Sequence, residues 1–217
     1  MVKGVIFDMD GTMFDTERIS SEVWKKAGEI LHLDIDDAFI QTFIGRNPVA
    51  VRQTFLDKYG TDFNYDEIRA LHATETRKIL DQEGIPLKEG LIWLLEYLKR
   101  EKIPAAVATS TERAVAEYNI KKAGVYDYFS AFMYGDMIEI GKPNPDVFLK
   151  AAKLLGQNPE ECLVLEDSVA GVLAGKAAGC AVIYIPDIVI VPEEVKEGIA
   201  AEKENLSQVV DWIEETK

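Results

Sequence analysis

The hydrophobic residues of this chain are concentrated in short continuous runs, and segments with helical spacing separate the later runs. Continuous apolar runs are typical of strands that are covered on both faces, as in parallel sheets. Leu91, Leu94, Leu95 and Leu98 recur at helical spacing, and the segment 147–155 shows the same repeat. This alternation predicts an α/β fold with a doubly wound parallel sheet. The predicted strands are Val2–Phe7, Pro104–Thr109, Ala131–Tyr134, Cys162–Leu165 and Ala181–Ile185, of which 131–134 is the weakest.

The interval between the first predicted strand and the helix that ends near Lys99 has no strand pattern. A connection of this length without structure of its own is uncommon in a compact domain. We therefore expect an α/β core formed by residues 1–15 and 85–217, with a helical cap at 16–84 inserted after the first strand. The helices predicted in the insert are Glu17–Leu31, Asp36–Phe43, Pro48–Tyr59 and Tyr65–Gln82.

Polar and charged residues follow directly where four of the predicted strands end. Ligands of open α/β sheets bind beyond the carboxyl ends of the strands, so these residues are candidates for a functional site. The candidates are Asp8 and Asp10 after the first strand, Thr109, Ser110 and Thr111 after the second, Lys142 beyond the weak strand, and Glu166 and Asp167 after the run at 162–165.

The carboxylates among these candidates suit a metal ion. Asp8 and Asp10 are two residues apart, so on an extended chain they point to the same side, and Asp167 joins them if its strand lies beside the first. Three carboxylates at about 4–5 Å repel one another by several kcal/mol per pair at an effective dielectric constant near 20. A divalent cation removes this penalty, and oxygen ligands with room for water favour Mg²⁺. The alternative is that Glu166 and Asp167 only cap a helix.

Thr109 and Lys142 have the chemistry of phosphate ligands. A hydroxyl at a strand end, beside a helix N-terminus, can donate to a phosphate oxygen, although a turn or cap role is the alternative for Thr109 alone. Pro143 favours an extended conformation for Lys142, which is held just outside the next helix, whereas a lone surface lysine usually serves only solubility. Together with the carboxylates, these residues supply a nucleophile, an acid/base, an oxygen donor, a cation and a metal cage. A phosphoryl-transfer enzyme requires these chemical groups.

The composition limits the partners of the protein. The net charge of −14 argues against nucleic acid and anionic membranes, because both would be repelled. Cys162 and Cys180 lie neither in a C-x-x-C pair nor beside a histidine, so we expect two buried thiols rather than a disulfide or zinc ligands. No segment resembles a signal peptide or a membrane span. We expect a cytoplasmic monomer that acts on a phosphorylated small molecule.

Four motifs make the chain similar to the haloacid dehalogenase superfamily. FDMDGT at 7–12 resembles the first motif of that superfamily, D-x-D-G-T, and VATST at 107–111 resembles the second. GKPNPDVF at 141–148 and LEDSVAG at 165–171 resemble the third and the fourth. The helical insert resembles the α-helical cap of the β-phosphoglucomutase and sugar-phosphate phosphatase branch. The resemblance spans nearly the whole chain, in the right order.

The resemblance implies a role for each matching residue. Asp8 would be the nucleophile that forms an aspartyl-phosphate, and Asp10 would protonate the leaving group and then activate water. Mg²⁺ would be held by Asp8, the backbone carbonyl of Asp10, Asp167 and Glu166. The residues implied to hold the phosphoryl oxygens are Thr109, Ser110 and Lys142.

The choice between phosphatase and mutase depends on the insert. Asp10 favours phosphoryl over halide chemistry, since the dehalogenases of the superfamily lack this second aspartate. The mutases of this branch hold the second phosphate of their substrate with a cap-loop arginine, where this chain has Pro48, and their gating histidine corresponds to Ser20 here. Arg46 or Arg52 could substitute for that arginine. We therefore expect a phosphatase, with a β-phosphoglucomutase-type mutase as the alternative.

The expected substrate is small, because a lid that closes over the site leaves little room for a polymer, and a sugar phosphate is our hypothesis. A phosphoacceptor receiver domain also combines a doubly wound sheet with an acidic metal site, a threonine and a lysine. It is the remote alternative, because here the nucleophile is on the first strand, an insert follows, and Asp10 is placed to hydrolyse the acyl phosphate. The residues expected to select the substrate are Glu17, Arg46 and Asn47 in the insert and Thr111 and Arg113 in the core, each of which could equally be solvated surface.

Overall fold

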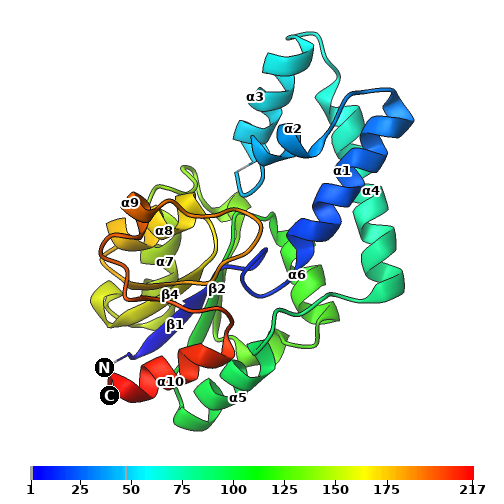
Figure 1. Cartoon of the computed structure of the whole chain (residues 1–217). Helices are drawn as coiled ribbons and strands as arrows, with labels where there is room; N and C mark the ends of the chain where they lie inside the picture. Colours follow the sequence, from blue (N-terminus) through cyan, green and yellow to red (C-terminus); the bar gives the residue numbers. More distant parts are fainter. Residues whose placement is uncertain (1, 47) are drawn as a thin grey trace. The chain divides into compact units, whose positions relative to one another are not determined.

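The computed structural model describes residues 2–46 and 48–217, and the chain divides into two compact units (Figure 1). The larger unit combines Met1–Asp15 with Pro86–Lys217, and the smaller unit is Thr16–Ile85. The larger unit contains a β-sheet flanked by helices, and the smaller unit is helical. Each unit has its own hydrophobic core, as expected of a domain.

The sheet of the larger unit has six parallel strands in the order β3-β2-β1-β4-β5-β6. The strands are β1 Gly4–Phe7, β2 Ala105–Ala108, β3 Ala131–Met133, β4 Cys162–Glu166, β5 Ala181–Tyr184 and β6 Ala201–Glu202. Phe7 of the central strand β1 pairs with Val107 on one side and with Leu165 on the other. The chain builds outward from β1 to β3, then crosses to β4 and builds outward the other way. The direction therefore reverses between β1 and β4, where open α/β sheets form their binding crevice.

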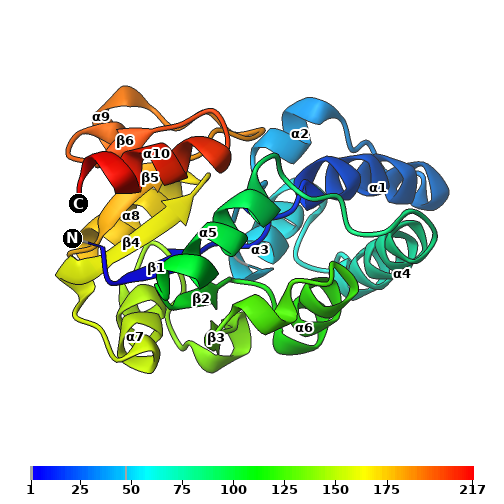
Figure 2. The ribbon, with the colours of Figure 1, turned by 90° about the horizontal axis from the view of Figure 1, so that it is seen from below.

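Helices cover both faces of this sheet (Figure 2). The helix α7 (Asp146–Leu155) packs against β1, β2 and β3, and α8 (Val169–Ala177) packs against β4 and β5. Phe148 of α7 joins Ile6 and Val164 in the core on that face. On the other face α5 (Leu91–Glu101) and α10 (Ser207–Glu215) contact each other. The helices of this unit are α5 Leu91–Glu101, α6 Arg113–Lys122, α7 Asp146–Leu155, α8 Val169–Ala177, α9 Glu193–Lys196 and α10 Ser207–Glu215, with 3₁₀ turns η1 Tyr126–Tyr128, η2 Gly135–Met137 and η3 Pro159–Glu161.

The core of the smaller unit is rich in aromatic side chains. The Trp24 ring stacks on His72 with ring centroids 4.0 Å apart and packs against Phe55 at 5.1 Å. Aromatic rings bury a large apolar area each, so a few of them suffice for a small helical unit. Its helices are α1 Thr16–Leu31, α2 Asp37–Gln41, α3 Pro48–Tyr59 and α4 Tyr65–Glu83.

The predicted α/β class with a doubly wound parallel sheet is confirmed, whereas some element ends are wrong. The first strand begins at Gly4 instead of Val2, and the helix predicted to end at Phe43 ends at Gln41. The strand β6 was not predicted, because it is short, one of its residues is exposed, and it has no apolar run. Cys162 and Cys180 are buried and free, as predicted. Within residues 2–46 and 48–217, no helix has both the length and the hydropathy that crossing a membrane requires.

Candidate active site

The predicted site residues that follow β1, β2 and β4 lie together at the edge of the sheet formed by the carboxyl ends of these strands. Asp8 follows β1, and its N–H donates to the carbonyl oxygen of Leu165 at 3.0 Å. This register places Asp8 beside Glu166, the last residue of β4. Thr109 follows β2 on the other side of β1. The side chains of Asp8, Thr109 and Glu166 are buried, so each polar group here needs a partner.

Lys142 supplies the positive charge in this cluster and is itself buried. Its Nζ donates to Oδ1 of Asp8, to Oε1 of Glu166 at 2.6 Å and to the carbonyl oxygen of Ala108 at 3.2 Å. Burial by itself lowers the pKa of Lys142, but the carboxylates of Asp8 and Glu166 outweigh burial and raise this pKa above its usual range. Burial raises the pKa of the Asp8 carboxyl, while Lys142 opposes this rise. The lysine therefore stays protonated at neutral pH.

The carboxylate of Glu166 is held by the start of α8. Its Oε2 accepts hydrogen bonds from the N–H of Asp167 and from the N–H and the hydroxyl of Ser168, each at 3.0 Å. The Ser168 hydroxyl accepts from the N–H of Gly171 at 3.0 Å and so caps the helix. A Cβ on Gly171 would lie 1.7 Å from Oε1 of Glu166, so glycine is needed at this point. The helix start thereby orients the carboxylate that binds Lys142.

Asp167 is held by the loop that follows β1. The Thr12 hydroxyl donates to Oδ1 of Asp167 at 2.8 Å, and both residues are buried. Gly11 has a φ of +90°, and a Cβ there would lie 2.2 Å from Oδ2 of Asp167, so both conformation and space require glycine. Carboxylate oxygens of Asp8, Glu166 and Asp167 lie within 4.8 Å of one another. Such a set of hard oxygen donors suits a divalent cation.

Asp10 lies next to this cluster and is half-buried. Its charge contributes to the raised pKa of Asp8, as expected of neighbouring carboxylates at positions i and i+2. Its Oδ2 accepts a hydrogen bond from the hydroxyl of Thr111 at 2.7 Å. Met9, between the two aspartates, is fully buried. The arrangement therefore places a second carboxylate, that of Asp10, beside the carboxylate that contacts Lys142.

The chain is similar to proteins of a known family. The family described as haloacid dehalogenase-like hydrolase matches residues 2–179. The chain belongs to this family. It is similar to hexitol phosphatase A of Escherichia coli (strain K12), with 36% identity over 188 residues that cover 84% of this chain and 82% of that protein. It is also similar to a bifunctional riboflavin kinase/FMN phosphatase of Arabidopsis thaliana, with 33% identity over 226 residues and 98% of this chain covered, and it spans 58% of that plant protein.

The fold of this haloacid dehalogenase-like hydrolase also occurs in solved structures. A β-phosphoglucomutase of Clostridium difficile superimposes with a TM-score of 0.82 and 22% identity, and the match covers 99% of this chain and 96% of that one. At this identity the likeness shows the shared fold of the core and the helical insert.

Of the remaining residues that were predicted to contact the substrate, none that the structure describes belongs to the buried cluster of Asp8, Lys142, Glu166 and Asp167. Ser110 is half-buried in the loop after β2, and Arg113 is exposed at the start of α6. Glu17 and Arg46 belong to the smaller unit, where Glu17 is half-buried on α1 and Arg46 is exposed. Asn47 lies outside the described residues. The assignment of these five residues to the substrate stays a prediction.

Three residues of the hydrolase site were not predicted from the sequence, although each lies within the motif FDMDGT or LEDSVAG. Thr12 binds Asp167, Ser168 binds Glu166, and Gly171 leaves space for Glu166. The pair Ser168 and Gly171 has the i, i+3 spacing of a helix N-cap, which is a signal that the sequence does contain. Thr12 has no such signal, because its partner lies 155 residues away along the chain.

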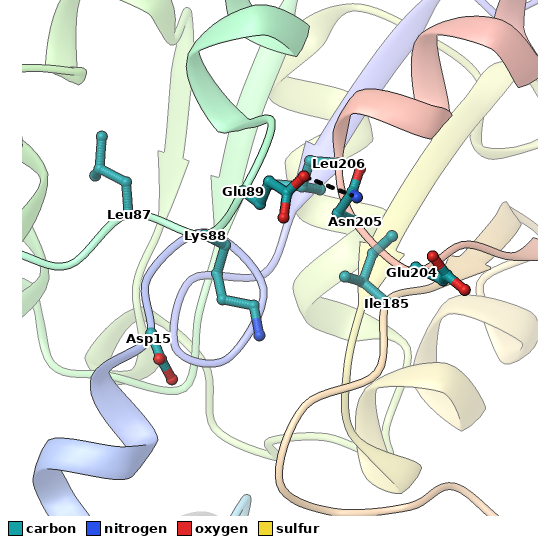
Figure 3. Close-up of a pocket in the computed structure, with 8 residues that line it drawn as sticks. All are labelled: Asp15, Leu87, Lys88, Glu89, Ile185, Glu204, Asn205 and Leu206. Atoms are coloured by element: carbon teal, nitrogen blue, oxygen red, sulfur yellow. Dashed lines mark hydrogen bonds between the residues drawn. The ribbon is translucent and has the colours of Figure 1, made fainter.

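A separate cavity of about 260 Å³ lies within the larger unit (Figure 3). Beside it, the ammonium group of Lys88 pairs with Oδ1 of Asp187 at 2.8 Å. The predicted catalytic residues do not line this cavity, so it is distinct from the acidic cluster. The lining residues are Asp15, Leu87, Lys88, Glu89, Ile185, Glu204, Asn205 and Leu206.

Proposed function

We propose that this haloacid dehalogenase-like hydrolase is a Mg²⁺-dependent phosphatase that hydrolyses a small sugar phosphate through an aspartyl-phosphate on Asp8. The observation that carries the proposal is the buried cluster in which Lys142 contacts both Asp8 and Glu166, with Asp167 beside them and Asp10 as neighbour. A cation next to a strand-end carboxylate is what attack on a phosphoryl group requires. The names of the relatives, which include a hexitol phosphatase, support the same activity.

The donor set fits Mg²⁺. Three buried carboxylates with oxygens within 4.8 Å of one another provide hard oxygen ligands, and the Gly11 backbone leaves space beside Asp167. Asp8, Asp167, Glu166 and the backbone carbonyl of Asp10 would hold the ion. When bound, Mg²⁺ would neutralise negative charge on the transferring phosphoryl group.

In the first half-reaction, a carboxylate oxygen of Asp8 attacks the phosphorus of the substrate. The bond between phosphorus and the sugar oxygen breaks, and the electron pair of that bond goes to the leaving oxygen, which takes a proton from the carboxyl group of Asp10. Lys142 lies against Asp8, so its charge is available to the phosphoryl oxygens at the point of attack. Thr109 and Ser110, at the end of β2, would donate to the same oxygens.

In the second half-reaction, Asp10 is a carboxylate and takes a proton from water. The water oxygen attacks phosphorus, the bond to the Asp8 oxygen breaks, and inorganic phosphate leaves. A receiver-type switch would stop before this step. Asp10 is adjacent to the nucleophile and supplies the base that this step needs.

The smaller unit is proposed to act as the cap that selects the substrate. Its helices follow Asp15 directly, and its two ends join the larger unit at Asp15 and Pro86. Loops and inserted domains beside an active site commonly exclude water and select the substrate. The residues proposed to contact the sugar are Glu17, Arg46 and Asn47 in this unit and Arg113 in the larger one.

The test is phosphate release from a panel of sugar phosphates, sugar-alcohol phosphates and p-nitrophenyl phosphate with Mg²⁺. The wild type should release phosphate, Asp8→Asn should lose this activity, and Asp211→Asn, an exposed residue of α10, should retain it. Unchanged release by Asp8→Asn would refute the nucleophile assignment. Conversion of glucose 1-phosphate to glucose 6-phosphate, primed by a bisphosphate, would establish the mutase instead. A stable phosphoprotein without turnover would establish the switch.

A further inference from the structure

We propose that Thr111 is a positioning residue that sets the orientation of the Asp10 carboxylate for proton transfer, an inference that rests on the proposed phosphatase function. The Thr111 hydroxyl donates to Oδ2 of Asp10 at 2.7 Å, a short contact typical of a hydrogen bond to a carboxylate. From its position in the sequence, Thr111 is expected to contact the substrate. The contact with Asp10 gives its hydroxyl a different role.

The loop that carries Thr111 is anchored at several points. The N–H of Thr111 donates to the Thr109 hydroxyl at 3.0 Å, and the Thr111 carbonyl oxygen accepts from the N–H of Gly135 at 2.9 Å. The N–H of Arg113 donates to Oδ1 of Asp136 at 3.1 Å. These bonds fix the backbone on both sides of the Thr111 side chain. The hydroxyl is therefore presented to Asp10 from a rigid support rather than from a mobile loop.

The turn η2 fits against this loop because Gly135 has no side chain. A Cβ at Gly135 would lie 2.1 Å from the carbonyl oxygen of Ser110. Any other residue would push the loop away from η2 and, with it, the Thr111 hydroxyl away from Asp10. The position of Asp10 is thus tied, through Thr111, to the end of β3.

The orientation of a general acid matters most when the leaving group is a poor one. A proton must pass to the leaving oxygen as the bond to phosphorus breaks, and a misaligned acid cannot deliver it. p-Nitrophenol leaves readily as an anion, whereas phenol is a weaker acid and needs the proton more. Loss of the Thr111 hydroxyl should therefore slow the hydrolysis of phenyl phosphate more than that of p-nitrophenyl phosphate. Neither of these substrates contains a sugar, so the comparison reports on the leaving group alone.

The experiment compares kcat/KM for these two aryl phosphates with Mg²⁺ at one pH. In Thr111→Val we expect kcat/KM to fall about 10- to 100-fold for phenyl phosphate and about threefold or less for p-nitrophenyl phosphate. Thr111→Ser retains the hydroxyl and should restore the wild-type ratio. Thr216→Val, which removes an exposed hydroxyl at the end of α10, is the matched control.

The alternatives give different patterns. If kcat/KM of Thr111→Val falls equally for both aryl phosphates, or if KM rises with kcat unchanged, the positioning role is overturned. Either result would favour a direct contact between Thr111 and the substrate. The same selective loss in Thr111→Ser as in Thr111→Val would also overturn it, because the hydroxyl would then not be the relevant group. If the wild type releases phosphate but Thr111→Val is unchanged, the inference fails and the phosphatase assignment stands. If the wild type hydrolyses no phosphomonoester, both fail.

Discussion

Replacement of Lys142 by methionine tests how the acidic cluster is stabilised. The substitution keeps most of the side-chain length but removes the ammonium group that contacts Asp8 and Glu166. Two like charges 4.8 Å apart, the limit within which the carboxylate oxygens lie, repel by about 3.5 kcal/mol at an effective dielectric constant of 20. Removing one partner of a buried ion pair typically costs about 3–5 kcal/mol. We therefore expect the free energy of unfolding to fall by about 3–5 kcal/mol in EDTA.

The pH dependence of this loss has a definite sign. Without Lys142, the folded variant avoids the repulsion between its carboxylates only by keeping a proton on Asp8, which burial and the charge of Glu166 both favour because they raise the pKa of its carboxyl, whereas the unfolded chain releases that proton near its ordinary pKa of 3.8. Above that pKa the folded variant binds more protons than the unfolded chain. Its free energy of unfolding should therefore decrease as the pH rises toward the raised pKa of Asp8.

The assay is urea unfolding followed by circular dichroism, with EDTA and with MgCl₂. Mg²⁺ can replace the missing charge, and at about 100 times its Kd it should return about 2.7 kcal/mol. Lys150→Met, an exposed lysine on α7, is the matched control and should change stability by about 0.5 kcal/mol or less. A Lys142→Met protein as stable as the wild type in EDTA would refute the reasoning that the ammonium neutralises the cluster.

Two further changes test the surroundings of the site and the smaller unit. Gly171→Ala places a Cβ 1.7 Å from Oε1 of Glu166, so the free energy of unfolding should fall by about 1–3 kcal/mol in a thermal unfolding assay. Phosphatase activity should fall as well. An unchanged stability and activity would contradict the close approach of Gly171 to Glu166. Burial lowers the pKa of His72 from 6.5 to about 4, so protonation of this side chain favours the unfolded chain. As the pH drops from 6.5 to 4, the free energy of unfolding should therefore fall by at most about 3 kcal/mol through His72. His72→Phe should show a smaller decline in its thermal midpoint than the wild type, and an equal decline would exclude His72 as a source of it.

Much of the fold follows from the order of the apolar runs. A doubly wound sheet has few arrangements, and the carboxyl ends of its parallel strands share one edge. This is why Asp8 and Glu166 could be placed together from the sequence although they belong to different strands. The strand β6 has no apolar run, so its position at the sheet edge could not be predicted.

The sequence predicts which residues form the site better than it predicts the contacts between them. The motif around Lys142 predicts a phosphoryl-binding role, but nothing in the sequence indicates that Lys142 also contacts Glu166. The bond between Thr111 and Asp10 joins residues 101 positions apart. It depends on how closely η2 approaches the loop after β2, which is decided by the packing of Gly135. Such approaches depend on tertiary packing, which local spacing does not encode.

The covalent step on Asp8 is the central claim, and trapping the phosphorylated residue tests it most directly. The protein is mixed with p-nitrophenyl phosphate and Mg²⁺, quenched in acid during turnover and reduced with borohydride, which converts an aspartyl-phosphate to homoserine. Peptide mass spectrometry should then find homoserine at position 8, in larger amount in Asp10→Asn because hydrolysis of the intermediate is slowed. Reduction at another residue, or phosphate release with no reduced residue at all, would contradict the account.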